Sequence, residues 1–354
     1  MLSQGLVHKA LSPLFYGSGA YLRRWRRIAG KEPITAVVCY HRVVADDALT
    51  SDRFDIERGI DASTFEAQMR FLMAHFLPVN ASEVLEPSEP RLRFAVTFDD
   101  GYEDSYSVAA PILRRLGLPG TFFVVGDYVG TDRLFWWEQL ANMIRETESS
   151  RLELTRQTID ALGANPEDTR LAIGTWSERE AAFARLSYLF RRTQTEQVVE
   201  CMEQTAQGAG VEIRQTGRDY PLMNWSQLKE LAEQDFEIGC HTASHRCLAG
   251  ASDSHLAVET HDCVDAMKSA LDGPVDSFAY PYGGREYVDD GAVEAVGRCG
   301  VRVGFGGGLG IVTAGANPYR LPRLQLLRKQ AFACAYRLQN AFNATPGLRA
   351  TAGS

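Results

Sequence analysis

The stretch Arg93-Phe94-Ala95-Val96-Thr97-Phe98-Asp99-Asp100-Gly101-Tyr102 combines an apolar run with two adjacent carboxylates and a glycine. The run predicts a buried strand, and open α/β sheets place their ligands beyond the carboxyl ends of their strands. Because successive side chains on an extended backbone point to opposite sides, Asp99 and Asp100 can take different roles. One could hold a metal while the other handles a proton. The alternative is a simple turn, in which Asp and Gly are favoured for backbone reasons.

Composition and charge limit the class of protein. With 354 residues, of which 45% are hydrophobic and 23% charged, the chain can bury a large core as one elaborated domain or two. The formal net charge of -8 argues against a nucleic-acid binder that relies on attraction to phosphate. The seven cysteines are scattered without a CxxC pair, so they predict neither a disulfide framework nor a zinc ribbon. That usage is typical of a reducing cytoplasm.

The N-terminal residues 1–33 predict a helical arm, with apolar positions at helical spacing interrupted by Pro13, Gly17 and Gly19. Its basic cluster follows the apolar residues, which is not the layout of a secretory signal, and no apolar run approaches the roughly 20 residues that span a bilayer. We therefore expect a cytoplasmic protein. Every charged residue before Glu32 is basic, and two alternatives stay open. Residues 1–31 could contact an anionic membrane as a peripheral arm at the inner membrane, or pack on their own domain or a second subunit.

Strands and helices alternate through residues 34–344, which indicates a parallel sheet built from βα units. A strand is expected at 34–40, and a helix from about Ser63 with Ser63 and Glu66 as its capping box. The other expected elements are helices at 108–116, 225–233, 254–271 and from about 329, strands at 121–125, 236–240, 277–280 and 301–304, and a segment at 320–327.

The alternation lapses between about residues 131 and 220. A long helical pattern at 177–207, with Ser177 and Glu180 as its capping box, dominates this region, and no strand pattern is visible in it. We therefore expect a helical insertion in the domain. Residues 345–354 are expected to form a flexible tail.

Two further motifs follow strand ends. His241-Thr242-Ala243-Ser244-His245 places two imidazoles four residues apart, which can converge on one ion if the loop curls, and imidazole with carboxylate is a good zinc set. Ala279-Tyr280-Pro281-Tyr282-Gly283 is either a simple turn or a turn that aims a backbone N–H at a developing oxyanion. Cys240 and Cys247 flank the histidines, but Cys240 should point away from His241 on an extended backbone, which argues against a Cys/His structural site.

Together and in this order, Thr97-Phe98-Asp99-Asp100-Gly101 and these two motifs resemble the polysaccharide deacetylases, the NodB-homology domains of carbohydrate esterase family 4. Tyr40-His41-Arg42 resembles the YHxx segment of the poly-N-acetylglucosamine deacetylase branch. The resemblance covers about residues 34–327 apart from the insertion. It implies an α/β fold, a distorted (β/α) barrel of about seven parallel strands.

The resemblance also implies roles for individual residues. Asp100, His241 and His245 would hold a divalent metal, with Zn2+ as the expected ion, and Asp99 would be the general base. The backbone N–H of Tyr282 would complete an oxyanion hole. Pro281, Tyr282 and Arg323 are the expected substrate-binding residues. The implied activity is metal-dependent removal of N-acetyl groups from amino sugars of a polysaccharide or a lipid-linked glycan.

The sequence departs from the family pattern at two places. Many members take a general acid from a C-terminal histidine, but no histidine follows His261 here. In the YHxx branch the histidine after the first strand takes that place, which assigns the acid to His41, although a histidine that merely satisfies a strand end is the alternative. Many relatives have an arginine that orients the base where this chain has Ala279, and Arg302 or Arg323 could replace it.

Two other functions stay open at this point. These departures favour a catalytically silent glycan-binding or scaffold domain, whereas the retention of both aspartates and both histidines argues against it. The same chemistry could also act on an O-acetyl ester or another C–N amide, because specificity lies in loops and in the insertion.

Overall fold

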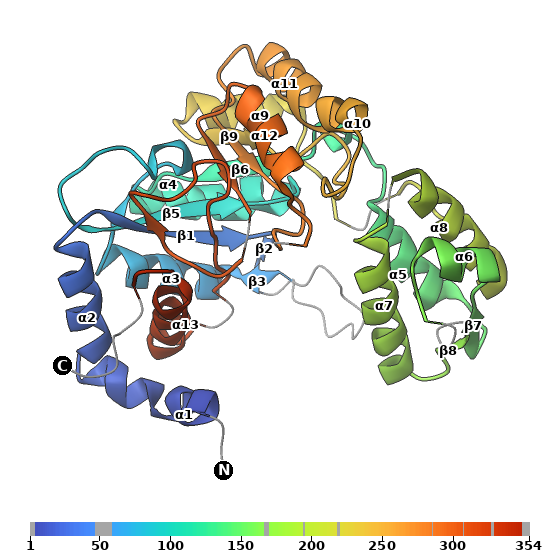
Figure 1. Ribbon diagram of the computed structural model, residues 1–354, viewed down its shortest axis with the longest axis horizontal. Helices are drawn as coiled ribbons and strands as arrows, with labels where there is room; N and C mark the ends of the chain where they lie inside the picture. Colours follow the sequence, from blue (N-terminus) through green and yellow to red (C-terminus); the bar gives the residue numbers. More distant parts are fainter. Residues whose placement is uncertain are drawn as a thin grey trace.

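The computed structural model describes residues 4–46, 59–165, 170–193, 195–217, 220–284, 286–306, 308–326 and 329–348. A curled sheet forms its centre, with the strand order β11-β10-β9-β6-β5-β1-β12 (Figure 1). Neighbours from β11 to β1 are parallel, β12 is antiparallel to β1 at the edge, and β4 pairs with β5. The strands are β1 Ile34–Tyr40, β4 Leu77–Pro78, β5 Leu92–Phe98, β6 Thr121–Val124, β9 Glu237–Cys240, β10 Ser277–Ala279, β11 Val303–Phe305 and β12 Val312–Thr313.

Residues 321–324 close the sheet into a barrel. Leu321 forms a parallel bridge with Phe305 of β11, and Leu324 forms a parallel bridge with Val38 of β1. The backbone N–H of Cys39 donates to the carbonyl of Leu324 over 2.9 Å. The segment therefore completes the ring begun by the six mutually parallel strands, which confirms the expected distorted (β/α) barrel. Strands β1 and β5 are buried along their whole length, as continuous apolar runs predict for strands covered on both faces.

Helices cover the outside of the barrel (Figure 1). Two of the expected helices contain π-helical turns, η2 and η5, which sequence patterns do not distinguish from α-helix. The helix expected at 108–116 begins three residues earlier, as η2, and ends as expected at Gly117 with φ 66°. The elements are β2 Val43–Val44 paired with β3 Ile60–Asp61, α3 Ala62–Met73, η1 Ala81–Glu83, η2 Ser105–Ala109, α4 Ala110–Leu116, η3 Gly126–Tyr128, α9 Trp225–Glu233, α10 Asp253–Ala257, η5 Val258–Asp262, α11 Cys263–Leu271, α12 Asp290–Arg298 and α13 Ala331–Ala344.

Both expected capping boxes are wrong. Strand β3 stays extended through Asp61, so Asp61 caps α3 and its carboxylate accepts from the N–H of Thr64 over 2.6 Å. Glu66 instead pairs with Arg70. In the insertion the box is Thr175 with Glu178, two residues before the expected pair.

The insertion forms a separate group of elements beside the barrel, drawn in green in Figure 1. It has its own apolar core, in which Leu140, Ile144 and Leu186 are fully buried. The expectation that it contains no strand is wrong, because β7 and β8 form an antiparallel pair of three residues each, too short to give a pattern. The long helix expected at 177–207 is two helices. The elements are α5 Trp136–Glu146, β7 Arg151–Glu153, α6 Arg156–Ala161, β8 Arg170–Ala172, α7 Trp176–Phe190 and α8 Thr195–Ala209.

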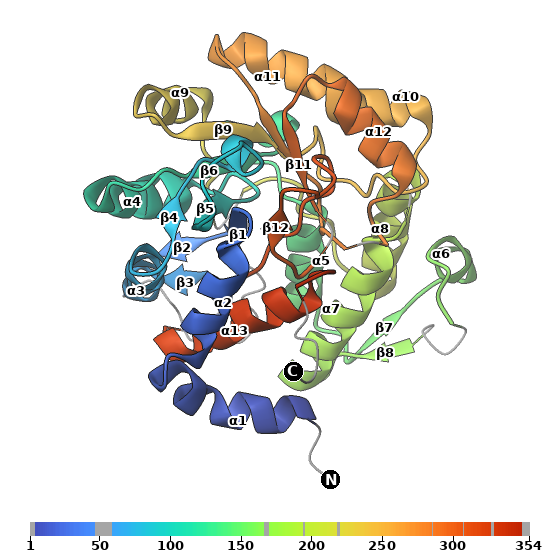
Figure 2. The ribbon, with the colours of Figure 1, turned by 60° about the vertical axis from the view of Figure 1, so that its left-hand side comes forward.

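The N-terminal arm consists of α1, Gln4–Gly17, and α2, Ala20–Ala29, which lie beside α13 (Figure 2). Trp25 is fully buried, stacks on Phe342 at 5.4 Å between ring centroids and donates to Gln339 over 3.0 Å. The arm therefore packs on its own domain. Thr345, the first residue of the expected tail, is buried, whereas 349–354 lie outside the described residues. No helix within the described part of the chain is long and apolar enough to cross a bilayer.

Candidate active site

Strand β5 brings both aspartates to the carboxyl end of the barrel. The N–H of Asp99 still donates to the carbonyl of Tyr40 on β1, and the chain then turns sharply at Asp100 and Gly101 with φ of 72° and 81°. Glycine suits this position because of its positive φ, and a Cβ there would also make a tight contact of 3.2 Å with Val124. The turn leaves both carboxylates buried, with Asp99 4% and Asp100 3% exposed.

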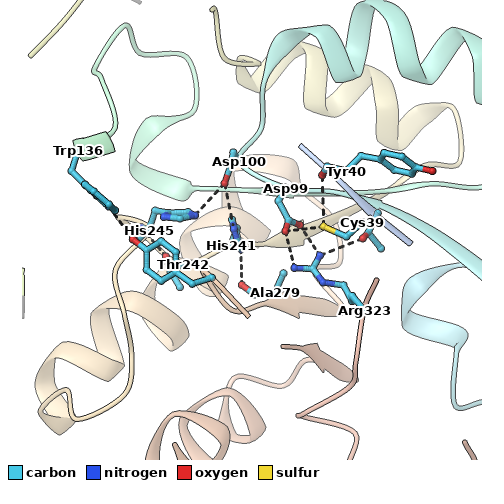
Figure 3. Close-up of polar contacts among 12 residues, drawn as sticks. Cys39, Tyr40, Asp99, Asp100, Trp136, His241, Thr242, His245, Ala279 and Arg323 are labelled. Atoms are coloured by element: carbon cyan, nitrogen blue, oxygen red, sulfur yellow. Dashed lines mark hydrogen bonds and ion pairs between the residues drawn. The ribbon is translucent and has the colours of Figure 1, made fainter. Parts of the chain in front are cut away.

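The loop after β9 curls and brings both histidines to Asp100 (Figure 3). Oδ1 of Asp100 lies 3.4 Å from Nε2 of His241 and 3.1 Å from Nε2 of His245. Thr242 and His245 both adopt left-handed backbone, and the Thr242 hydroxyl accepts from the N–H of His245 over 2.9 Å. Such strained conformations persist where the surrounding structure enforces them, and they cluster at functional sites.

The donor set of this cluster fits a divalent metal. Nδ1 of His241 lies 2.7 Å from the carbonyl of Ala279, which can only accept, so Nδ1 carries the hydrogen and Nε2 presents a lone pair. That lone pair faces the carboxylate of Asp100, and two acceptors face each other favourably only with a proton or a metal ion between them. Two ligand atoms of a tetrahedral zinc site lie about 3.3 Å apart, close to the distances here. The ligand atoms of Asp100, His241 and His245 all lie within 4.8 Å of one another.

Asp99 lies beside this cluster and is held by Arg323. Their guanidinium and carboxylate groups form two parallel hydrogen bonds of 2.7 Å each, and the thiol of Cys39 contacts the same carboxylate at 3.3 Å (Figure 3). Burial alone would raise the pKa of Asp99, but the positive charge of Arg323 outweighs it and the pKa lies below the usual range. Asp99 is therefore ionised at neutral pH and held in one orientation.

Of the two arginines expected to replace the motif arginine, Arg323 contacts Asp99, whereas Arg302 is half exposed and pairs with Glu86. Arg323 lies on the segment that closes the barrel. Ala279 itself is fully buried and contributes its carbonyl to His241. Arg323 also lines the cavity, as expected for a substrate-binding residue, but both of its terminal nitrogens are engaged by Asp99.

The clustered residues line a cavity of about 420 Å³. His41 reaches it from the end of β1, on the same cavity as Asp99 and Asp100. Tyr282 also lines it, with φ 64°, and its backbone N–H donates to no acceptor in the described ranges. Pro281 is buried and does not line the cavity. The structure thus brings together the predicted residues except Pro281.

One wall of the cavity comes from the insertion. The sequence motifs did not predict that the insertion contributes to the site. Trp136, Trp137, Phe183 and Arg191 line it. The ring of Trp137 lies 4.6 Å from that of His245, and Nε1 of Trp136 donates to the hydroxyl of Tyr282 over 2.9 Å (Figure 3). In the sequence, only the two adjacent tryptophans at the start of α5 indicate a special surface. Their spacing gives no sign that they would contact His245 and Tyr282, which lie more than a hundred positions later.

A buried carboxylate supports the histidine loop from outside. Glu259, on the π-helical turn η5, is 2% exposed and accepts from the backbone N–H of Ser244 over 2.9 Å and from the Ser244 hydroxyl. Ser244 lies between the two histidines in the sequence. Glu259 therefore holds the loop in its curled form, a role for which the sequence offers no signal.

Fold and site define the class of this protein: a distorted (β/α) barrel with an Asp-His-His cluster and a second carboxylate where its parallel strands end. The family model for polysaccharide deacetylases matches residues 88–203 and 195–304. The chain belongs to the polysaccharide deacetylase family, which confirms the resemblance seen in its motifs.

Individual relatives are distant. The chain is 28% identical over 137 residues to YxkH of Bacillus subtilis (strain 168), a protein named for the same family, and the match spans 36% of this chain and 44% of YxkH. The Streptococcus pyogenes deacetylase PplD, solved in complex with acetate, has a similar structure with a TM-score of 0.53, 15% identity and coverage of 88% of this chain and 98% of PplD. IcaB from Ammonifex degensii gives a TM-score of 0.51 at 17% identity, over 86% of this chain and 97% of IcaB. At these identities the structural likeness shows the fold alone.

Proposed function

We propose that the protein is a metal-dependent hydrolase that removes N-acetyl groups from amino sugars of a polysaccharide or a lipid-linked glycan. The observation that carries the proposal is the ionised, Arg323-held carboxylate of Asp99 beside the Asp100, His241 and His245 cluster on one cavity. Family membership supports glycan deacetylation. The N-acetyl group, the metal and the type of glycan are part of the proposal.

The residues divide the chemistry among them. A divalent cation held by Asp100, His241 and His245, which we take to be Zn2+, would polarise the acetamide carbonyl and lower the pKa of water. Asp99 accepts the proton of the attacking water, and Arg323 keeps its carboxylate oriented. The backbone N–H of Tyr282 donates to the developing oxyanion. His41 gives a proton to the departing amine.

Replacement of the base tests this assignment. We expect Asp99→Asn to lower acetate release from N-acetylchitooligosaccharides about 10²- to 10⁴-fold, because general-base catalysis contributes that much, while the metal content stays unchanged. Elemental analysis and an acetate assay with and without chelator measure both quantities. Asp160→Asn, on the exposed surface of α6, is the control. Full activity in the Asp99→Asn protein would refute the proposal.

The alternative is a silent glycan-binding or scaffold domain, which the missing arginine at Ala279 and the absent C-terminal histidine favoured. The first of these two arguments no longer holds. Arg323 contacts the base that the missing motif arginine left without a partner. The absent C-terminal histidine remains as an argument, so a chain that binds N-acetylchitooligosaccharides without any acetate release would favour this alternative. Acetate release from O-acetylated sugars in the same panel would favour the ester substrate.

Peripheral membrane contact of residues 1–31, and a cytoplasmic location at the inner membrane, stay predictions. Leu11 and Leu14 of α1 are 39% and 69% exposed, although α2 is packed on the domain. We expect Leu11→Ser with Leu14→Ser to reduce co-sedimentation with anionic liposomes without loss of the fold, because burial of these side chains in the interface would drive binding. Equal co-sedimentation of variant and unaltered protein would remove the prediction.

A further inference from the structure

One cation on the cavity wall has no anionic partner. The acidic side chains of the wall are Asp99, which pairs with Arg323, and Asp100, whose charge would be balanced by the cation that it holds with the two imidazoles. Arg191 is a further cation on the same wall, and in the described ranges no carboxylate forms an ion pair with it. Its guanidinium lies 5.6 Å from the centroid of the Tyr282 ring. The guanidinium of Arg191 is therefore available to an anionic group of a ligand near Tyr282.

A second guanidinium lies near the same ring. Arg246 directly follows His245 and does not itself line the cavity, and its Nε and Nη1 atoms are buried without a hydrogen-bond acceptor among the described residues. Buried guanidinium N–H groups without an acceptor cost free energy, so such a group in a native structure calls for a partner. Burial raises the pKa of the Tyr282 phenol, whereas Arg246 and Arg191 oppose that rise, consistent with two cations close to this ring.

The positions of these groups limit where a partner would lie. The ring of Tyr282 is 5.0 Å from that of His245 and also contacts Arg191, so the cationic wall is about one sugar ring away from the Asp-His-His cluster. Trp136, Trp137 and Phe183 form the apolar part of the same wall and suit the faces of sugar rings. An anionic group near the guanidinium groups would thus be carried by the sugar whose acetamide reacts, or by its direct neighbour.

We propose that Arg191 forms an anion subsite of the cavity, to which the nearby positive charge of Arg246 adds, and that the substrate carries an oxyanion, a phosphate or a carboxylate, on the N-acetylated sugar or on its direct neighbour. The inference rests on the proposed function, since it names the substrate class of the same cavity. The planar guanidinium fork matches both kinds of oxyanion through paired, charge-assisted hydrogen bonds. The insertion then has a function in this chain: it places Arg191, the residue after α7, on the cavity wall.

The test compares charged and neutral substrates. Acetate release is measured from N-acetylglucosamine 1-phosphate, N-acetylmuramic acid and neutral N-acetylchitobiose, for the unaltered protein and for Arg191→Ala, Arg246→Gln and Arg192→Ala. Arg192 is the matched control, because it removes the same charge one residue away, where the side chain contacts Tyr188 and does not line the cavity. Comparison of the phosphorylated substrate with the carboxylated substrate distinguishes the two sources of the oxyanion.

We expect the unaltered protein to prefer at least one charged substrate over the neutral one in kcat/KM by about ten- to a hundredfold, the value of one charge-assisted hydrogen bond. Arg191→Ala should lose that preference, with kcat/KM falling more for the charged than for the neutral substrate, Arg246→Gln should weaken the preference, and Arg192→Ala should keep it. No preference for a charged substrate, or an equal loss on charged and neutral substrates in Arg191→Ala, would overturn the subsite.

A binding experiment separates this inference from the proposed function. If the unaltered protein releases no acetate from any substrate, the proposed function fails, and the subsite is then judged by titration calorimetry with N-acetylglucosamine 1-phosphate and N-acetylglucosamine. Tighter binding of the phosphorylated sugar that weakens in Arg191→Ala but not in Arg192→Ala supports the subsite. Equal binding of the two sugars overturns it. Arg191 is exposed at the end of α7, so its variant should fold even if Arg246→Gln does not.

Discussion

At the scale of single residues, the ion pair with Arg323 keeps the buried carboxylate of Asp99 ionised and oriented, which the proposed role as a base requires. The motif in the sequence identified Asp99, but either Arg302 or Arg323 could have been its partner. Only the closure of the barrel determines that Arg323 reaches the carboxylate. Residues 224 positions apart meet here, and side-chain reach over that separation has no local signal. Burial of both groups makes the pair sensitive to loss of either member.

Removal of the arginine tests that sensitivity. We expect Arg323→Ala to lower the free energy of unfolding by about 3–5 kcal/mol, because it leaves an uncompensated charge in the interior. Arg302→Ala, which breaks a half-exposed pair with Glu86, should cost less than about 1 kcal/mol. Urea denaturation of both variants measures the difference. Equal stability of the two proteins would contradict the structural account of the pair.

Asp104 predicts a dependence of stability on pH. Burial raises its pKa to about 6, although Arg42 opposes the shift through an ion pair of 2.7 Å. A carboxyl whose pKa is higher in the folded than in the unfolded state binds its proton more tightly when folded, so its contribution is present at low pH and is lost as the pH rises from about 4 to about 6. Relative to Asp104→Asn, the unaltered protein should therefore lose stability over that range.

Thermal unfolding of both proteins between pH 4 and pH 7 measures this difference. The difference in unfolding free energy, unaltered protein minus Asp104→Asn, should fall with rising pH and level off above pH 6. The exposed Asp160→Asn protein should run parallel to the unaltered one. A difference that grows with pH would mean that Arg42 outweighs burial.

At the scale of elements, the site consists of strand ends followed by strained turns. Asp100, Thr242, His245 and Tyr282 all have positive φ, and all four follow β5, β9 or β10. The strands and the motifs after them could be predicted, because apolar runs and turn residues are local signals. The helix caps, the π-helical turns and the short pair β7 and β8 could not, because they depend on how the chain enters each element and on tertiary contacts.

Glu259 connects one such π-helical turn to the Asp-His-His cluster through Ser244. We expect Glu259→Gln to weaken metal affinity about 10- to 100-fold, because groups that orient ligands from outside contribute at that level. Competition with a chromophoric chelator measures the affinity, and Glu294→Gln, on the exposed face of α12, is the control. Unchanged affinity in Glu259→Gln would show that the loop keeps its curled form without this carboxylate.

At the scale of the whole molecule, the arm and the insertion extend the barrel in different ways. The arm adds to the barrel's core through Trp25, whereas the insertion has a core of its own and reaches the barrel at the cavity. The sequence left two options for the arm, since its amphipathic pattern suits a membrane and a protein surface equally. The contribution of the insertion to the cavity could not be predicted from the sequence. Like the pairing of Asp99 with Arg323, it depends on contacts between segments that are distant in the sequence.

Truncation of the buried indole tests the packing of the arm. We expect Trp25→Ala to lower the free energy of unfolding by about 3–5 kcal/mol, because a large buried aromatic and its stacking on Phe342 are lost. Trp176→Ala, whose side chain is 44% exposed on α7, is the matched control and should cost less. Similar stabilities of the two variants would indicate that the arm detaches readily from the domain.

The barrel is closed by residues 321–324, and the same four residues carry the arginine that holds Asp99. During synthesis both aspartates and both histidines leave the ribosome well before this stretch. A chain that stops before residue 321 would contain both aspartates and both histidines and yet lack the guanidinium that orients Asp99, so the proposed hydrolysis would have to wait until this last segment of the barrel has been made.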